Sequence, residues 1–387
     1  MLSRHIRDIP LWRATVTPLA SIIGSGFLVV VPMLTHIAGP LSIWAISAVV
    51  FLSLWIGGAL RFNIQHDGRE DSANGGRSTQ ALERLSDIAL AFAYIISIAF
   101  YIRLMCGFIL TGVNAYTPFN ADILATVVLA FIGIYGFRRG LHGLERLEQY
   151  SVTIKLAIIA SLLVGLMYYD SSQGYSLSGL PTPDTSLWEG LRLLGGMLLI
   201  VQGFETSKYL ASTYDATLRS RSMLFAQILA GMIYIGFVAL AMPLTATLDD
   251  AIPNETAIIG LSGEITLVLP IMLVIAAAMS QFSAAIADIL GAGGVIEDES
   301  QRRIAARTSY FIITVLALVL IWNSHIYQVI SYASRAFAFY YLLQSILAAQ
   351  LAASVLAGRR RFLRICSYSA LALIFLVITL FATPVGA

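Results

Sequence analysis

The stretch Ala20-Ser21-Ile22-Ile23-Gly24-Ser25-Gly26-Phe27 lies in the middle of an apolar segment that runs from Val16 to Ile37. The segment is long enough to cross a membrane, yet two glycines and a serine interrupt it. Glycine costs about 1 kcal/mol relative to alanine in a helix interior, so we expect the helix to break here. Inside a bilayer, unwound backbone is tolerated only where it is buried in protein or lines a cavity. The interruption therefore predicts a binding site.

A second interruption occurs near the middle of the chain. There Gly195-Gly196 and Gln202-Gly203-Phe204-Glu205 fall within the apolar segment from Leu191 to Leu210. Glycine-interrupted spans in corresponding positions of two halves are typical of secondary transporters. The alternative interpretation is that these glycines let helices pack closely.

The composition indicates an integral membrane protein. Of the 387 residues, 58% are hydrophobic and 12% are charged, whereas about 25% are charged in soluble domains. The mean hydropathy is +0.81. The sequence contains neither an H-E-x-x-H motif nor a pair of aspartates in facing spans, so we expect no enzyme, no metal and no cofactor, and nothing in it implies nucleic acid. Cys106 and Cys366 are expected to be small buried apolar residues without a disulfide.

Windows of about 20 residues predict an all-α polytopic membrane protein with eleven transmembrane helices. The predicted spans are residues 16–37, 41–60, 85–111, 123–137, 152–169, 191–210, 224–248, 265–285, 308–321, 330–356 and 368–381.

The distribution of charge predicts the orientation of the chain. With the N-terminus in the cytoplasm, 19 of the 24 basic residues fall on the inner side. The charged residues of the outer loops are all acidic. This arrangement follows the positive-inside rule and predicts a multi-pass protein of the cell (inner) membrane, with its C-terminus outside. The other five basic residues lie in or at the edge of spans, namely Arg103, Lys155, Arg192, Lys208 and Arg335.

The two interruptions predict internal symmetry. Gly24 and Gly203 each lie in the first span of a block of five. Because five is odd, the second block must be inverted relative to the first, with broken helices 1 and 6 meeting near the midplane. We expect a transporter core at residues 1–358, with repeats at about 15–170 and 187–358. Residues 359–387 form an extra C-terminal helix.

Three motifs carry a resemblance to a known family. Ile23-Gly24-Ser25-Gly26-Phe27, followed by Val31-Pro32 and Ala38-Gly39-Pro40, resembles the first span of the amino acid-polyamine-organocation (APC) superfamily. Gly203-Phe204-Glu205 resembles the family's sixth span, and residues 149–156, which include Lys155, resemble the fifth. The chain departs from the pattern in two places. Gly57-Gly58-Ala59-Leu60 replaces the usual acidic residue of the second span, and Lys208 is unusual.

The resemblance implies a LeuT-type fold and a substrate site at the two interruptions. Backbone N–H groups around Ser25, Gly26 and Phe27 would hold a carboxylate, and carbonyls near Ile22 and Gln202 would hold an amine. Phe204 would form an apolar gate, or else pack in the core. The whole predicted substrate site comprises Ile22, Ile23, Gly24, Ser25, Gly26, Phe27, Gln202, Gly203 and Phe204.

Lys155 is the most informative single residue. A lysine within an apolar span is costly and usually faces a cavity, pairs with a partner or moves protons. The resemblance implies that its ammonium takes the place of a sodium ion, against carbonyls near Ala20 and Ile23 and the Ser283 hydroxyl. A second hydroxyl ligand is replaced by Ala284. We therefore expect sodium-independent transport, although Lys155 could instead snorkel to the membrane edge.

Three further charged residues are candidates for coupling or gating. Glu205 could exchange a proton or only hold the broken backbone, and Lys208 could pair with it at i, i+3. Arg103 and Arg335 could form an outer gate or bind an acidic substrate, or make structural helix contacts. Candidate polar residues that line the pocket are Tyr101, Gln281 and Tyr332.

The sequence as a whole predicts a sodium-independent secondary transporter of an amino acid or related amine. It would work by alternating access within the lipid bilayer, with either proton symport or exchange. The alternatives are a transporter of another small ion or solute on the same fold and a non-transporting membrane sensor.

Overall fold

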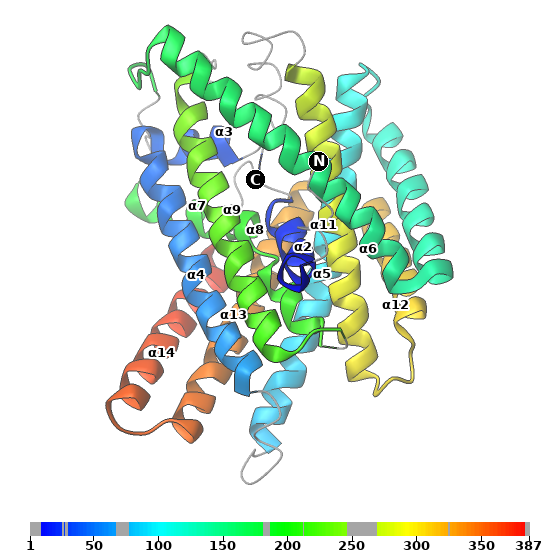
Figure 1. Cartoon of the computed structure of the whole chain (residues 1–387), viewed down its shortest axis with the longest axis vertical. Helices are drawn as coiled ribbons and strands as arrows, with labels where there is room; N and C mark the ends of the chain where they lie inside the picture. The colour runs from blue at the N-terminus through cyan, green and yellow to red at the C-terminus, as the bar shows by residue number, and fades with distance from the viewer. Residues whose placement is uncertain are drawn as a thin grey trace.

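The structure is a computed structural model of the chain. It describes residues 9–24, 27, 30–66, 77–180, 186–211, 213–245, 269–323 and 326–383. All regular structure in these residues is helical, and Figure 1 shows the helices gathered into one bundle. Eight helical segments of the described chain are long and apolar enough to cross a membrane. The predicted all-α polytopic membrane fold is confirmed.

The helices follow the order of the predicted spans. The α-helices are α2 (Pro10–Ile22), α3 (Val30–Ala38), α4 (Ser42–His66), α5 (Arg77–Gly112), α6 (Pro118–Gln173), α7 (Leu187–Gly196), α8 (Leu198–Val201), α9 (Ala216–Thr245), α11 (Leu269–Glu299), α12 (Ala306–Asn323), α13 (Ile326–Val355) and α14 (Gly358–Phe381). Two 3-10 helices, η1 (Gly39–Leu41) and η3 (Phe204–Tyr209), complete the described set.

The fourth and fifth predicted spans both lie in α6. A straight helix of its 56 residues would be roughly 84 Å long at 1.5 Å per residue, far more than a bilayer core of about 30 Å. The backbone leaves helical geometry at Gly140, where φ is 63° and ψ is −158°, and the two arms of α6 run in different directions (Figure 1). Two spans are therefore joined by a kink.

Both predicted interruptions are real breaks. The first span divides into α2 and α3, and α2 ends where Ile23 takes φ −84° and ψ 51°. The predicted sixth span divides into α7, α8 and η3. Between α8 and η3, Gln202 is extended and Gly203 has φ 113°. Only glycine adopts that φ at low cost, so the sequence encodes the second break directly.

The broken segments occupy the centre of the bundle. Figure 1 shows α2 in the middle, and α2 contacts α9, α11 and η3. Residues Ala14 to Ile22 of α2 are all buried. The outer helices expose large apolar side chains such as Trp44, Phe51 and Leu373, as a surface that faces lipid requires. The polar groups of the breaks are thus enclosed by protein, as expected for unwound backbone in a bilayer.

One prediction about the cysteines is wrong. Cys106 is buried as expected, but Cys366 is exposed on α14. Its helix lies at the edge of the bundle against α13 (Figure 1), so an apolar residue there can face outward. Both cysteines are free.

Candidate functional site

Lys155 lies on the second arm of α6 and reaches the end of α2. Its side chain is fully buried. The ammonium Nζ donates to the carbonyl oxygens of Ala20 at 2.9 Å and Ile23 at 2.7 Å, and to the Ser283 hydroxyl at 2.8 Å. These are the three partners that the family resemblance implied. An ammonium has three donors, so all are satisfied, and its charge lies at the negative C-terminal end of a helix.

A buried acid that the sequence analysis missed lies two turns before Lys155 on the same helix. Glu148 is 1% exposed, and one of its carboxylate oxygens accepts a hydrogen bond from the Thr17 hydroxyl of α2 at 3.0 Å. Residue 148 falls between two predicted spans, 123–137 and 152–169. The seven-residue spacing from Lys155 was the available signal, because it places both side chains on one helix face.

The carbonyls at the end of α2 are already engaged. Ile22 O accepts from the Tyr234 hydroxyl of α9 at 2.9 Å, and the same hydroxyl lies 3.0 Å from Ile200 O of α8. Tyr234, which sequence reasoning also missed, therefore joins the two broken spans. Ile23 O also accepts from the Ser280 hydroxyl, and a predicted amine contact at Ile22 would have to displace Tyr234.

A small cavity borders the first break. Its walls include Gly24 and Phe27 of the break, Ile159 of α6, and Ser280 and Gln281 of α11. Its volume is about 10 Å³, room for about one water molecule and far less than the roughly 300–1,000 Å³ of typical small-molecule sites. Gln281, one of the predicted pocket residues, donates to Gly24 O at 3.2 Å. The predicted ligand residues Ser25 and Gly26 lie outside the described residues.

The second break is held by side chains from α5 and α13. Gln202 donates to the hydroxyl of Tyr101, another predicted pocket residue. Glu205 folds back so that one carboxylate oxygen accepts from Gly203 N at 2.9 Å and from the Tyr341 hydroxyl at 2.8 Å. Glu205 thus caps the broken backbone, which is one of the two roles expected for it.

Phe204 packs against an aromatic side chain. Its ring is 1% exposed and stacks on Tyr341, with 5.4 Å between centroids and 8° between planes. Phe27, at the first break, stacks on Phe237 with centroids 4.3 Å apart. The predicted gate is therefore in contact with the core in this structure, and its movement with substrate stays a prediction.

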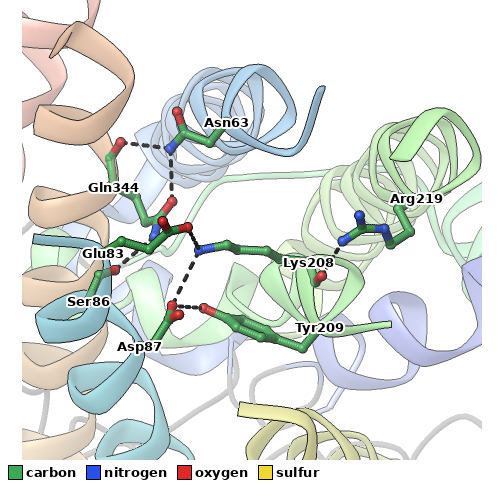
Figure 2. Close-up of polar contacts among 8 residues, drawn as sticks. All are labelled: Asn63, Glu83, Ser86, Asp87, Lys208, Tyr209, Arg219 and Gln344. Atoms are coloured by element: carbon green, nitrogen blue, oxygen red, sulfur yellow. Dashed lines mark hydrogen bonds and ion pairs between the residues drawn. The ribbon is translucent and has the colours of Figure 1, made fainter. Parts of the chain in front are cut away.

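The expected pairing of Lys208 with Glu205 is wrong. Lys208 Nζ lies 3.5 Å from Glu83 Oε1 and 3.3 Å from Asp87 Oδ1, both on α5. Figure 2 shows the ammonium between these two carboxylates, with Tyr209 donating to Asp87 at 2.6 Å. The pairing failed because η3 is a 3-10 helix and Glu205 turns toward Gly203. Lys208 instead ties the second broken span to α5.

Other polar contacts surround this ion pair. Arg219 of α9 donates to the carbonyl of Lys208. Asn63 of α4 donates to the side-chain oxygen of Gln344 at 2.9 Å, and Gln344 donates to Ser86 at 2.8 Å. Figure 2 places the two sets side by side. Three helices are therefore linked to η3 or α5 at one end of the broken span: α9 and α13 directly, and α4 through α13.

The two predicted gate arginines do not come together. Arg103 forms an ion pair with Asp122 at the start of α6, at 3.1 Å, and donates to Ile321 O of α12 at 3.4 Å. This is the structural helix contact that we kept as the alternative. Arg335 and the predicted pocket residue Tyr332 are exposed on α13, so neither lines an enclosed site here.

A third buried acid joins α11 to α2 and α5. Asp288 is fully buried. Its Oδ1 accepts from the Ser21 hydroxyl at 2.8 Å, and its Oδ2 contacts the Ser97 hydroxyl. The sequence analysis gave Asp288 no role. Serines in apolar spans were the missed signal.

Comparisons with known proteins identify the family. A family model described as APC superfamily transporter matches residues 4–382. A protein of Aquifex aeolicus (strain VF5), itself uncharacterized, is 44% identical over 353 residues, which cover 90% of this chain and 86% of that protein.

Solved structures show the same fold at low sequence identity. A manganese transporter of Eremococcus coleocola has a TM-score of 0.60 and 12% identity over 98% of this chain and 88% of its own. A Na+-coupled sialic acid symporter has a TM-score of 0.62 and 13% identity over 97% of this chain and 91% of its own. Since the family match spans nearly the whole length, the chain belongs to the amino acid-polyamine-organocation (APC) superfamily of secondary transporters.

Proposed function

We propose that this transporter moves an amino acid or related amine without sodium, by proton symport or exchange. The observation that carries the proposal is the Lys155 ammonium, which is bound by Ala20 O, Ile23 O and the Ser283 hydroxyl at 2.7–2.9 Å. In the family pattern described above, this position belongs to sodium in the sodium-coupled members. A fixed positive charge there excludes a second cation by repulsion.

The neighbouring residue supports the same conclusion. Ala284 follows Ser283 on α11 and is fully buried, and a methyl group offers no oxygen to a cation. A sodium ion at this position would have one hydroxyl and two carbonyl groups as ligands. The Lys155 ammonium already binds all three. Loss of the lysine charge, rather than departure of an ion, would then free the end of α2 to move.

The substrate site is proposed between the two breaks. The cavity at Gly24 and Phe27 supports this location. Backbone N–H groups at the first break suit a carboxylate, and carbonyl groups at Ile22 and Gln202 suit an amine. Because the present cavity is small and Tyr234 occupies Ile22 O, substrate entry requires the broken spans to separate.

The remaining features fit alternating access. The inverted five-plus-five repeat, the division at residue 358 and the orientation with a cytoplasmic N-terminus in the cell membrane are part of this proposal. In that orientation, Lys208 and its partners on α5 lie at the cytoplasmic end of the broken sixth span. They would hold the inner side closed, and their separation would open it.

The test is counterflow in proteoliposomes. Vesicles are loaded with one unlabelled amino acid or amine at a time, and uptake of the labelled compound is measured, so that no driving ion has to be known. The native chain and Ser161→Ala should both exchange at least one member of the panel. Ser161 is a fair control because it is exposed on α6 and bonds only to its own helix.

Lys155→Ala should lose this exchange, because the carbonyls of Ala20 and Ile23 are left without a donor. Exchange of a metal ion or sugar acid by the native chain, with none for amino acids or amines, would contradict the proposed substrate class.

A further inference from the structure

We propose that Asp288 is a proton-binding site that joins α2 to α5 and α11 and releases its proton when the first broken span moves. The site is distinct from Lys155 and is made by the Ser21 and Ser97 hydroxyls. Its role in coupling rests on the proposed function, but the presence of the proton does not.

The Ser97 hydroxyl lies near more acceptors than it has hydrogens to donate. A serine hydroxyl has one hydrogen to donate. The Ser97 oxygen lies 3.0 Å from Tyr94 O, an acceptor of its own helix, and also within hydrogen-bonding distance of Asp288 Oδ2. Two acceptors cannot share one hydrogen at full strength. A protonated Asp288 supplies the second hydrogen, donating from Oδ2 to Ser97 while Ser97 donates to Tyr94 O.

The surroundings of Asp288 favour the neutral acid. The residue is fully buried, and among the described residues no lysine, arginine or histidine forms an ion pair with it. An isolated buried carboxylate is costly and normally becomes neutral. A single proton removes that cost and completes the hydrogen bonds.

Among the described residues, the titratable groups whose charge acts on Asp288, or is acted on by it, include two acids and a phenol. They are Glu205 on η3, Glu148 on α6 and Tyr94 on α5. The partner from α2 is Ser21. From α12, Tyr310 packs on Gly293, more than one turn along α11. The Lys155 ammonium donates to Ala20 O, Ile23 O and the Ser283 hydroxyl, and it forms no hydrogen bond or ion pair with Asp288 among the described residues.

Two buried polar atoms without a hydrogen-bond partner belong to residues near the acid. In the described part of the chain, Tyr94 Oη and Glu205 Oε1 are buried without a hydrogen-bond partner. The Tyr94 hydroxyl lies next to Gly291, one turn after Asp288. Glu205 binds Gly203 N, and Gly203 packs directly on Ser21. Both atoms therefore belong to side chains that lie beside the elements holding the acid.

The proposed step is a proton transfer. In the closed form, Oδ2–H of Asp288 donates to Ser97 and Ser21 donates to Oδ1. When α2 moves, Ser21 leaves, water reaches the acid, and the proton passes to water as the O–H bond breaks. The resulting carboxylate retains a single hydroxyl partner in Ser97. The released charge then opposes closure until a proton binds again.

Infrared spectroscopy of the protein in lipid nanodiscs tests the site without a substrate. A protonated buried carboxylic acid gives a carbonyl stretch above the amide bands, and this band shifts in heavy water. We expect the native chain to show such a band at neutral pH. One component of this absorption should be lost in Asp288→Asn and retained in Glu205→Gln and Glu148→Gln, because Glu205 and Glu148 are buried acids as well. If Asp288→Asn removes no component of the native absorption, the proposal is overturned.

A second variant covers the case in which Asp288→Asn does not fold. Ser97→Ala keeps the acid but removes its acceptor, so the band should persist and move to higher frequency. An unmoved band would contradict the proposed hydrogen bond.

Transport then tests coupling. With any compound that the native chain exchanges, Asp288→Asn should abolish accumulation driven by a pH gradient, and retained accumulation would refute the coupling role. If the native chain exchanges nothing, the proposed function fails while the infrared assignment stands.

Discussion

Replacement of Gly203 by alanine tests the close approach of the two broken spans. Gly203 has φ 113°, and a Cβ built on it would lie 2.2 Å from Ser21 Oγ and 2.8 Å from the Ser21 carbonyl carbon. The backbone atom cannot turn away as a side chain can. Gly203→Ala must therefore either push η3 away from α2 or change the backbone at the break.

The cost follows from two terms. A non-glycine residue in a left-handed conformation costs about 1–2 kcal/mol. Insertion of a methyl group into a packed interior costs about 1–3 kcal/mol. Together they predict that Gly203→Ala lowers the free energy of unfolding by roughly 2–5 kcal/mol, a large share of the roughly 5–15 kcal/mol of a typical protein.

The assay is thermal unfolding in detergent, followed by tryptophan fluorescence. Gly236→Ala is the matched control, because it makes the same change in the interior of α9, where a Cβ meets no atom within 4 Å. The control should unfold at the native temperature or slightly above it, since alanine is favoured in helices by up to about 1 kcal/mol. If Gly203→Ala is as stable as Gly236→Ala, that result would contradict the close approach of the two broken spans at Gly203.

Three further predictions concern contacts of the broken spans and the scaffold. Lys208→Met leaves Asp87 without its cation and should lower the unfolding temperature, and Asp87→Asn in the same chain should recover part of the loss; no recovery would mean that the pair contributes nothing. Tyr234→Phe removes the hydroxyl shared by two carbonyls and should cost about 1–3 kcal/mol, measured by the same unfolding assay, and an unchanged midpoint would contradict the bridge. Arg103→Ala and Asp122→Ala should show a coupling energy of about 0.5–3 kcal/mol in a double-mutant cycle, whereas strictly additive effects would argue against the ion pair.

The sequence was most informative at residue types that are energetically unfavourable in a membrane helix unless the structure compensates for them. A glycine is a poor choice inside a membrane helix, so the breaks at Gly24 and Gly203 could be predicted. A lysine in an apolar span must find acceptors, and the family pattern named Ala20, Ile23 and Ser283 for Lys155. The apolar segments located the helices for the same reason, because lipid allows few other structures.

Long-range partners of ordinary residues could not be predicted in this way. Tyr234 and Ser97 are unremarkable in sequence, and their contacts depend on how helices far apart in the chain pack together. Lys208 was assigned to Glu205 by helical spacing, but η3 is not an α-helix and its lysine turns to Asp87. Side-chain direction at a break follows the local backbone, which spacing rules do not describe.

In the proposed function, the Lys155 ammonium takes the place of a coupling sodium ion. The most direct measurement is accumulation of a compound that the native chain exchanges, in proteoliposomes that carry either a sodium gradient or a pH gradient. We expect accumulation not to respond to the sodium gradient at any sodium concentration. Accumulation driven by sodium, in a chain whose Lys155 is intact, would contradict it.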